Sequence, residues 1–324
     1  THRCLKCHTD DSIELTQAMP ELSADAPAWN GLGERLMERW MVPWLIAPKS
    51  FRADSFMPQM LRGTPDSIAA DARDLAAFMA TLKSATPAAV PSVPDLTAPE
   101  RLTTGKKLFA DLGCVACHRL PGDQPAKDDP RQSLAHVNAK WQTAALLEFL
   151  RSPTQYFRWT RMPDFQLNEA EAAALAAYIQ SRAEPVPATI PVAPPANIER
   201  GRQLAMTTGC LNCHTLEGIK SQLSAPTLAE LRRGAWDTGC LAQDPSARTT
   251  APDFGFSAVQ REALRKFGQT EVRAVLQRPV PAEFAEHQYR LLRCNACHGR
   301  DTETDFWSSL KVDQALAMKS AAVN

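Results

Sequence analysis

Apolar side chains recur at helical spacing in three stretches of this chain, and each stretch follows residues that are typical of a helix start. The start signals are Thr64 before Pro65, Asn168 with Glu171 three residues later, and Ser257 with Gln260 three residues later. The apolar stripes consist of Ile68, Leu75, Phe78, Met79, Leu82, Leu175, Tyr178, Ile179, Leu264 and Phe267. None of these stretches alternates as a strand does, so the pattern predicts an all-α protein.

A second kind of helix is expected ahead of three short cysteine-containing motifs, and its key positions repeat. Thr97, with Glu100 three residues later, predicts a capped start for one of these helices. Nine and five residues before the first cysteine of each motif stand Gly105 and Phe109, Gly201 and Ala205, and Ala285 and Tyr289. The return of one unit at regular intervals is typical of an array of similar domains.

Proline-rich segments separate the repeated units and are expected to act as semi-rigid, extended spacers. The repeat and these segments together predict four domains, of which the first lacks a helix before its motif and the last is incomplete. The expected domains are residues 1–84, 98–184, 197–278 and 282–324, and the proline-rich linkers are residues 85–97 and 185–196.

The repeated motif is Cys-x-x-Cys-His, the attachment signal for c-type haem, in which two thiols bond one porphyrin and the adjacent histidine coordinates the iron. Zinc knuckles or disulfides are the alternative, but zinc sites pair two Cys-x-x-Cys units and need no histidine after every second cysteine. The four copies use eight of nine cysteines, which predicts four haem c groups. The copies are Cys4, Cys7 and His8; Cys114, Cys117 and His118; Cys210, Cys213 and His214; and Cys294, Cys297 and His298.

The composition adds few constraints to this interpretation. The 324 residues carry no formal net charge, and 44% of them are hydrophobic. A domain of the predicted size buries little apolar surface, so each haem is expected to supply part of its core. No run of charge indicates a nucleic-acid partner, and no apolar stretch reaches the length of a membrane span.

The order of helix, haem motif, short helices, Met-Pro segment and closing helix resembles the class I cytochrome c fold. The whole chain resembles a multihaem c-type cytochrome built from tandem domains of that family. In the family the first and last helices cross at a glycine and an aromatic residue, which Gly105, Phe109 and Tyr178 would match. The resemblance also implies that haem is attached outside the cytoplasm, on the periplasmic or extracellular side of a bacterial membrane.

The resemblance further implies how each iron is held. A proline carbonyl orients the proximal histidine in the family, which indicates Pro20 in the first unit and Pro226 in the third. Met-Pro after the motif marks a thioether ligand, so Met57 and Met162 are expected to complete the first and second irons. The alternative is that these methionines merely pack, and Met60 is a competitor in the first unit. Thioether ligation raises the reduction potential.

The third and fourth units depart from the family pattern. Ala251 stands where the third unit should carry its methionine, so that iron is either open, water-bound or ligated from elsewhere. Cys240, the one cysteine outside the motifs, is a candidate ligand or a small buried thiol. In the fourth unit Met318 lies too close to its motif and His287 is expected to pack, so the sixth ligand stays unassigned.

Electron transfer through four haems is the function that these residues favour, with the chain acting as the cytochrome module of a larger redox complex or oligomer. One alternative is an enzyme that binds a small ligand or sulfur substrate at the third haem, beside Cys240. Another is a building block of an end-to-end cytochrome wire. Redox proteins are the expected partners in each case.

Overall fold

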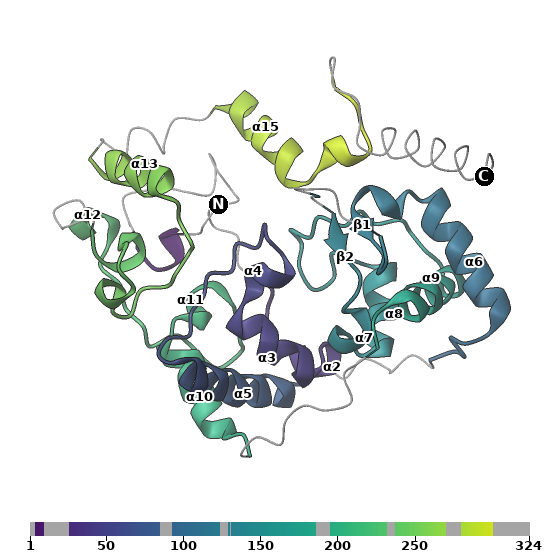
Figure 1. The fold of residues 1–324 in the computed structure, drawn as a ribbon, viewed down its shortest axis with the longest axis horizontal. Coiled ribbons are helices and arrows are strands. Elements are labelled where there is room, and N and C mark those ends of the chain that lie inside the picture. The colour runs from purple at the N-terminus through teal and green to yellow at the C-terminus, as the bar shows by residue number, and fades with distance from the viewer. Residues whose placement is uncertain are drawn as a thin grey trace. The chain divides into compact units, whose positions relative to one another are not determined.

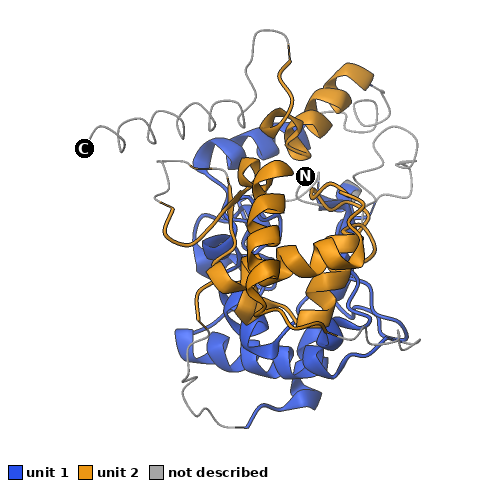
Figure 2. Cartoon of the chain, turned by 90° about the vertical axis from the view of Figure 1, so that its right-hand side faces the viewer, with its two compact units in different colours: residues 1–89, 188–280 blue, residues 90–187, 281–324 orange. Residues whose placement is uncertain are grey.

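The computed structural model describes residues 4–9, 26–84, 93–123, 129, 131–185, 195–231, 237–269 and 280–300. The chain divides into two compact units, each built from two separate stretches (Figure 2). Unit 1 combines residues 1–89 with 188–280, and unit 2 combines residues 90–187 with 281–324. These units differ from the expected succession of four consecutive domains.

Unit 2 contains two long helices that are separated along the chain by shorter elements (Figure 1). Its elements are α6 (Pro99–Asp111), η3 (Cys114–Ala116), β1 (His118–Arg119), β2 (Gln132–Ser133), α7 (Val137–Lys140), α8 (Thr143–Arg151), α9 (Glu169–Arg182), α15 (Pro281–Leu291) and η6 (Cys294–Ala296). Helix α9 packs against both α6 and α8, and its alanine-rich inner face is almost completely buried. The core of unit 2 therefore gathers around α9.

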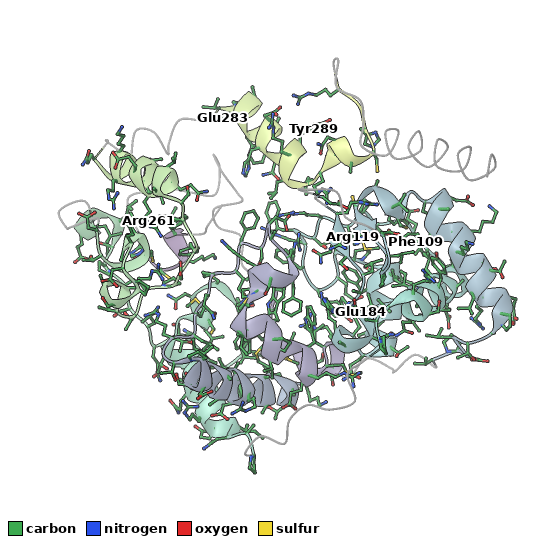
Figure 3. All side chains as sticks on the ribbon, in the orientation of Figure 1. Phe109, Arg119, Glu184, Arg261, Glu283 and Tyr289 are labelled. Carbon is green, nitrogen blue, oxygen red and sulfur yellow. The ribbon has the colours of Figure 1, made fainter. Side chains whose placement is uncertain are left out.

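Helices α6 and α9 cross in the way that the sequence predicts. A Cβ atom added at Gly105 would lie 1.9 Å from the carbonyl oxygen of Ala174 and 2.8 Å from the Cβ of Tyr178. One turn further along α6, Phe109, which is labelled in Figure 3, packs edge-on against Tyr178 with ring centroids 5.6 Å apart. Only glycine allows this approach of the two backbones, so the predicted crossing is confirmed.

The helix starts agree with the sequence except at α6. Asn168 and Glu171 form a capping box on α9. Thr97 does not cap α6, contrary to expectation: its main-chain N–H and hydroxyl both donate to Asp95, and Ala98 occupies the cap position. The carboxylate of Asp95, two residues before Thr97, accepts both of these hydrogen bonds and so competes with the helix cap. Pro99 at the first helical position has no N–H, so the helix start has one donor fewer to cap.

A two-residue parallel strand pair is a further departure from the all-helical expectation. His118 lies opposite Gln132 and Arg119 opposite Ser133. The Gln132 N–H donates to the carbonyl of Cys117 at 2.8 Å, which ties the returning loop to the end of the haem motif. A pair this short leaves no hydrophobic alternation, so the sequence pattern cannot reveal it.

Unit 1 is also helical in its described residues. Its elements are η1 (Cys4–Lys6), α2 (Leu32–Arg35), α3 (Glu38–Ile46), α4 (Pro48–Phe51), α5 (Pro65–Thr81), α10 (Ile198–Thr207), α11 (Cys210–Cys213), α12 (Leu228–Leu231), η4 (Gly239–Leu241), η5 (Pro245–Arg248) and α13 (Ala258–Gly268). Thr64 caps α5, and Ser257 with Gln260 forms a capping box on α13, both as predicted. No helix in the described part of either unit is long and apolar enough to cross a membrane.

Helix α10 packs against α5 rather than against α13, the closing helix of its own expected domain (Figure 1). A Cβ atom at Gly201 would lie 2.0 Å from the carbonyl oxygen of Asp74 and 3.0 Å from the Cβ of Phe78. This arrangement repeats the contact that Gly105 makes in unit 2. The boundaries 1–84 and 197–278 are therefore corrected: the repeat predicts which helix precedes each motif, but not which closing helix it crosses.

An ion pair accompanies this crossing. Asp74 is only 9% exposed, and its carboxylate accepts hydrogen bonds from the main-chain N–H of Asn197 at 2.8 Å and from Arg200 at 2.6 Å. Arg200 also binds Asp71. In unit 2 the residue that faces the glycine is Ala174, which has no charge. The ion pair thus distinguishes the α5–α10 crossing from the α6–α9 crossing.

We predict that Asp74→Ala and Arg200→Ala are energetically coupled. Each removes the same charge-assisted hydrogen bond, so the double variant should lose about 1–2 kcal/mol less stability than the two single variants summed. The measurement is urea unfolding of the four proteins in the cycle. The exposed pair of Glu199 and Arg202 is the matched control, with an expected coupling of about 0.3 kcal/mol. If the losses of stability in Asp74→Ala and Arg200→Ala simply add, the two side chains are not coupled, which would contradict the ion pair at this crossing.

Candidate haem sites

All four Cys-x-x-Cys-His motifs fold into a single helical turn. The turns are η1, η3, α11 and η6, and in each of them the main chain folds back onto the carbonyl of the first cysteine. His8, His214 and His298 donate their N–H groups to Cys4, Cys210 and Cys294 at 2.9, 3.0 and 2.8 Å. Residues three apart in such a turn share one side. The two thiols of each motif are thereby presented together, as one porphyrin requires.

A left-handed residue introduces three of these turns. Gly113, Gly209 and Arg293 stand immediately before the motif with φ of 67°, 90° and 60°. At Gly209 a side chain would also collide with Leu223, whose Cδ2 lies 2.6 Å from the position of the missing Cβ. The change of backbone direction ends the preceding helix and lets the motif turn begin at once.

The motif thiols differ in burial: Cys210 is buried, Cys4 and Cys297 are exposed, and the others are half-buried. Burial raises the pKa of the Cys114 thiol to about 12, and burial with neighbouring cysteines raises that of Cys7 to about 12. Cys210 is 6% exposed. All nine cysteines fall in the described residues, and none of them forms a disulfide there. The eight motif thiols are thus available to bond a porphyrin.

The second motif and Met162 belong to one core, as the sequence predicts. Cys114, Val115 and Met162 all pack against the same buried cluster of unit 2. The indole Nε1 of Trp159, three residues before Met162, is buried with no hydrogen-bond partner among the described residues. Such a donor suits a haem propionate. The chemistry of this donor set, with two thiols, an imidazole and a thioether, fits haem c.

The histidine of the third motif is held by residues near the N-terminal end of the chain. His214 Nδ1 is 2.7 Å from the carbonyl oxygen of Pro27. Two main-chain bonds flank this contact, from Ala26 to Cys213 at 2.8 Å and from Trp29 to Thr215 at 2.9 Å. A proximal imidazole held by a carbonyl in this way is fixed in orientation and made more basic.

Met57 lies in the same core as the third motif. Cys210 belongs to the buried cluster against which Met57, Leu204 and Leu211 pack. The Nε1 of Trp44, on α3, lies 3.2 Å from the Met57 sulfur. Met60 stays a competitor, because its Cε lies 3.3 Å from the position of a Cβ at Gly209. Both methionine candidates of the first expected domain are therefore beside the third motif.

The first motif is completed by the segment that follows the third. His8 Nδ1 is 2.7 Å from the carbonyl oxygen of Pro226, and the Leu228 N–H donates to Thr9 at 3.0 Å. Leu5 packs with Leu228 and with Phe267 of α13. These contacts place the proximal side of the first motif on residues 226–228.

Cys240 accompanies the first motif as well, and Ala251 lies beside its neighbour Gly239. Burial raises the pKa of the Cys240 thiol to about 11; Cys4 adds to this rise and Arg62 opposes it, so both groups are close by. A Cβ at Gly239 would lie 3.6 Å from that of Ala251. Arg62 donates to the carbonyl of Ala251, so the position without a methionine lies beside Arg62 as well as beside Gly239.

Three pairings expected from the sequence are corrected by these contacts. Met57 was expected with His8 but lies with His214. Cys240 is expected with His214, but Cys4 of the first motif contributes to its raised pKa. Ala251 is also expected with His214, but lies beside Gly239 and Arg62. Pro226 holds His8 instead of His214. Pro27, which sequence reasoning missed, holds His214, although its Ala-Pro context matches that of Pro226. Pro20 and Met318 lie outside the described residues.

The fourth motif follows α15, which carries the predicted Ala285 and Tyr289. The Tyr289 hydroxyl donates to the carbonyl of His298 at 3.0 Å, and the Arg300 guanidinium stacks over the same ring at 4.6 Å. Residues 280–300 contain no methionine, so its sixth ligand stays unassigned. Across the described residues, no group of three or more His, Cys, Asp or Glu side chains is placed to hold a metal ion.

We predict that alkylation of Cys240 in the holoprotein keeps accelerating as pH rises toward about 11. The thiolate is the reactive form, and a raised pKa leaves little of it below pH 9. The measurement is the rate of iodoacetamide modification by mass spectrometry, with Cys240→Ser as the unreactive control. A rate that levels off near neutral pH would indicate a low-pKa thiolate and contradict the expectation.

Comparison with known proteins identifies one part of the chain. Residues 102–183, from α6 to the end of α9, match the Cytochrome c family. No curated protein and no solved structure matches the chain. The matched residues contain the second motif, the Gly105 crossing and Met162. This match supports a cytochrome c domain in this part of the chain and implies covalently bound haem c, with its iron, as the cofactor.

Proposed function

We propose that the chain is an electron-transfer protein that carries haem c at all four motifs. The observation that carries this proposal is the pairing of motifs within each unit. In unit 1, Asn212 of the third motif donates to the carbonyl of Lys6 in the first at 3.4 Å, and Cys213 adds to the rise in the pKa of Cys7. In unit 2, Cys297 adds to the rise at Cys114. Motifs in contact would bring their porphyrins within reach of electron exchange.

The haem iron supplies the reversible one-electron change, and the chain's residues bind and orient the group. The thiols fasten each porphyrin. The carbonyls of Pro226 and Pro27 hold the rings of His8 and His214 in place. Met162 is suited to be the sixth ligand in unit 2, which would raise the potential and close that iron to other ligands.

The same residues would keep water away from the iron. Met162 packs against a cluster that includes Leu146, Leu150 and Leu175, all nearly fully buried. A dry, rigid surrounding changes little when the iron gains or loses charge, which favours fast transfer. Attachment of haem outside the cytoplasm would place the protein on the periplasmic or extracellular side of a bacterial membrane, with redox proteins as partners.

The haem count tests this function directly. Intact-mass spectrometry of the purified holoprotein should show four haems, and each Cys→Ala pair, such as Cys114→Ala with Cys117→Ala, should remove one. Cys240→Ser is the control and should retain all four. Bare thiols at any motif would contradict the count, and a protein whose haems are not reoxidised by another cytochrome would contradict electron transfer.

We predict that Met162→Ala converts one haem of the oxidised protein from low to high spin and lowers its potential. Loss of a thioether ligand removes the preference for reduced iron. Electron paramagnetic resonance and a redox titration give the two readouts. Leu120→Ala is the control, because Leu120 packs on the same cluster but has no donor atom. An unchanged spectrum in Met162→Ala would show that this methionine merely packs.

A further inference from the structure

We propose that the two haem sites of unit 1 exchange their distal segments along the chain. Met57 ligates the iron of the haem fastened at Cys210 and Cys213, and the haem fastened at Cys4 and Cys7 lacks a thioether ligand. This inference rests on the proposed attachment of haem at both motifs. It assigns the open or altered coordination to the N-terminal motif instead of the third.

The helix crossing supplies the first argument. In unit 2 the helix before the motif crosses the helix that follows the methionine segment, at Gly105 and Ala174. In unit 1 the helix with the same relation to Gly201 is α5, which follows Met57. Helix α13, which follows Ala251, makes no such contact with α10 in the described residues.

The spacing of the elements supplies the second argument. Helix α3 ends at Ile46 and is followed eleven residues later by Met57, just as α8 ends at Arg151 and is followed eleven residues later by Met162. Both helices end in a cap residue with nearly the same backbone angles. The segment from α2 to α5 is thus the counterpart of the segment from α7 to α9.

The shared core supplies the third argument. Met162 and Cys114 pack on one cluster in unit 2, and Met57 packs on the cluster that contains Cys210 in unit 1. The proximal carbonyl for this site comes from Pro27, thirty residues before Met57. Residues 26–82 therefore supply both the carbonyl that holds His214 and the methionine proposed for the opposite face of that haem.

The first motif has the complementary set of neighbours. Pro226 and Leu228 bind His8 and Thr9, and Cys240 lies beside Cys4. Neither the Ala251 position nor residues 226–231 and 237–269 offer a thioether, because these residues contain no methionine. Of the two haems in unit 1, the one at Cys4 and Cys7 is consequently the one that should bind carbon monoxide when reduced.

The methyl group of Met57 provides a direct test. In the reduced holoprotein with labelled methionine methyls, a methyl bound to iron is displaced far upfield by the porphyrin ring current, and Met57→Ala assigns its resonance. Removing the first haem with Cys4→Ala and Cys7→Ala should leave this displacement intact. Removing the third with Cys210→Ala and Cys213→Ala should abolish it, while Met162 stays displaced as the internal reference.

The reverse pattern, or a Met57 methyl that is not displaced in the unaltered protein, would overturn the inference. If haem removal unfolds unit 1, nuclear Overhauser contacts in the unaltered holoprotein decide the question. They should link the Met57 methyl to the haem whose thioethers come from Cys210 and Cys213, and a link to the haem of Cys4 and Cys7 would overturn the proposal. Mass spectrometry counts the haems independently, so failure of attachment is distinguished from failure of the exchange.

Discussion

Close contact between two helices at a glycine is the constraint on which the cores of both units depend. At Gly105 and Gly201 the neighbouring backbone occupies the space of a side chain, so the helices can lie no further apart without losing their core. Each motif begins three residues after its helix ends. The crossing therefore fixes where the thiols lie relative to the closing helix and to the methionine segment ahead of it.

The two crossings share a shape but differ in charge, and that difference gives the pairing its selectivity. Asp74 is buried against Arg200, and a buried carboxylate is costly without a partner. Helix α13 has Ala263 four residues before its inner aromatic residue Phe267, where α5 has Asp74 four residues before Phe78. Arg200 would thus meet no carboxylate at that place on α13. Such use of a buried polar contact to select one partner is known for helical assemblies.

Local features of the fold were predictable, whereas the pairing of distant segments was not. The capping boxes on α9 and α13 follow from residues three positions apart, and the structure confirms them. The Gly105 crossing joins distant residues and was expected from the resemblance to the cytochrome c fold; the structure confirms it as well. The exchange of Met57 and Ala251 that we propose could not be foreseen, because both halves of the repeat carry the same signals. Asp74 was the one available clue, but a lone acidic residue on an amphipathic helix ordinarily faces solvent.

The distance along the chain between contacting residues has a consequence for biosynthesis. Pro226 lies 218 residues after the histidine it holds, and Asp74 lies 126 residues before its arginine partner. The α6–α9 core is instead contiguous, so its loop-closure entropy is small and it can fold as soon as its last helix emerges. Unit 1 has to wait for most of the polypeptide to be made. Cys4 and Cys7 therefore spend that interval without the contacts that residues 226–228 later make beside them.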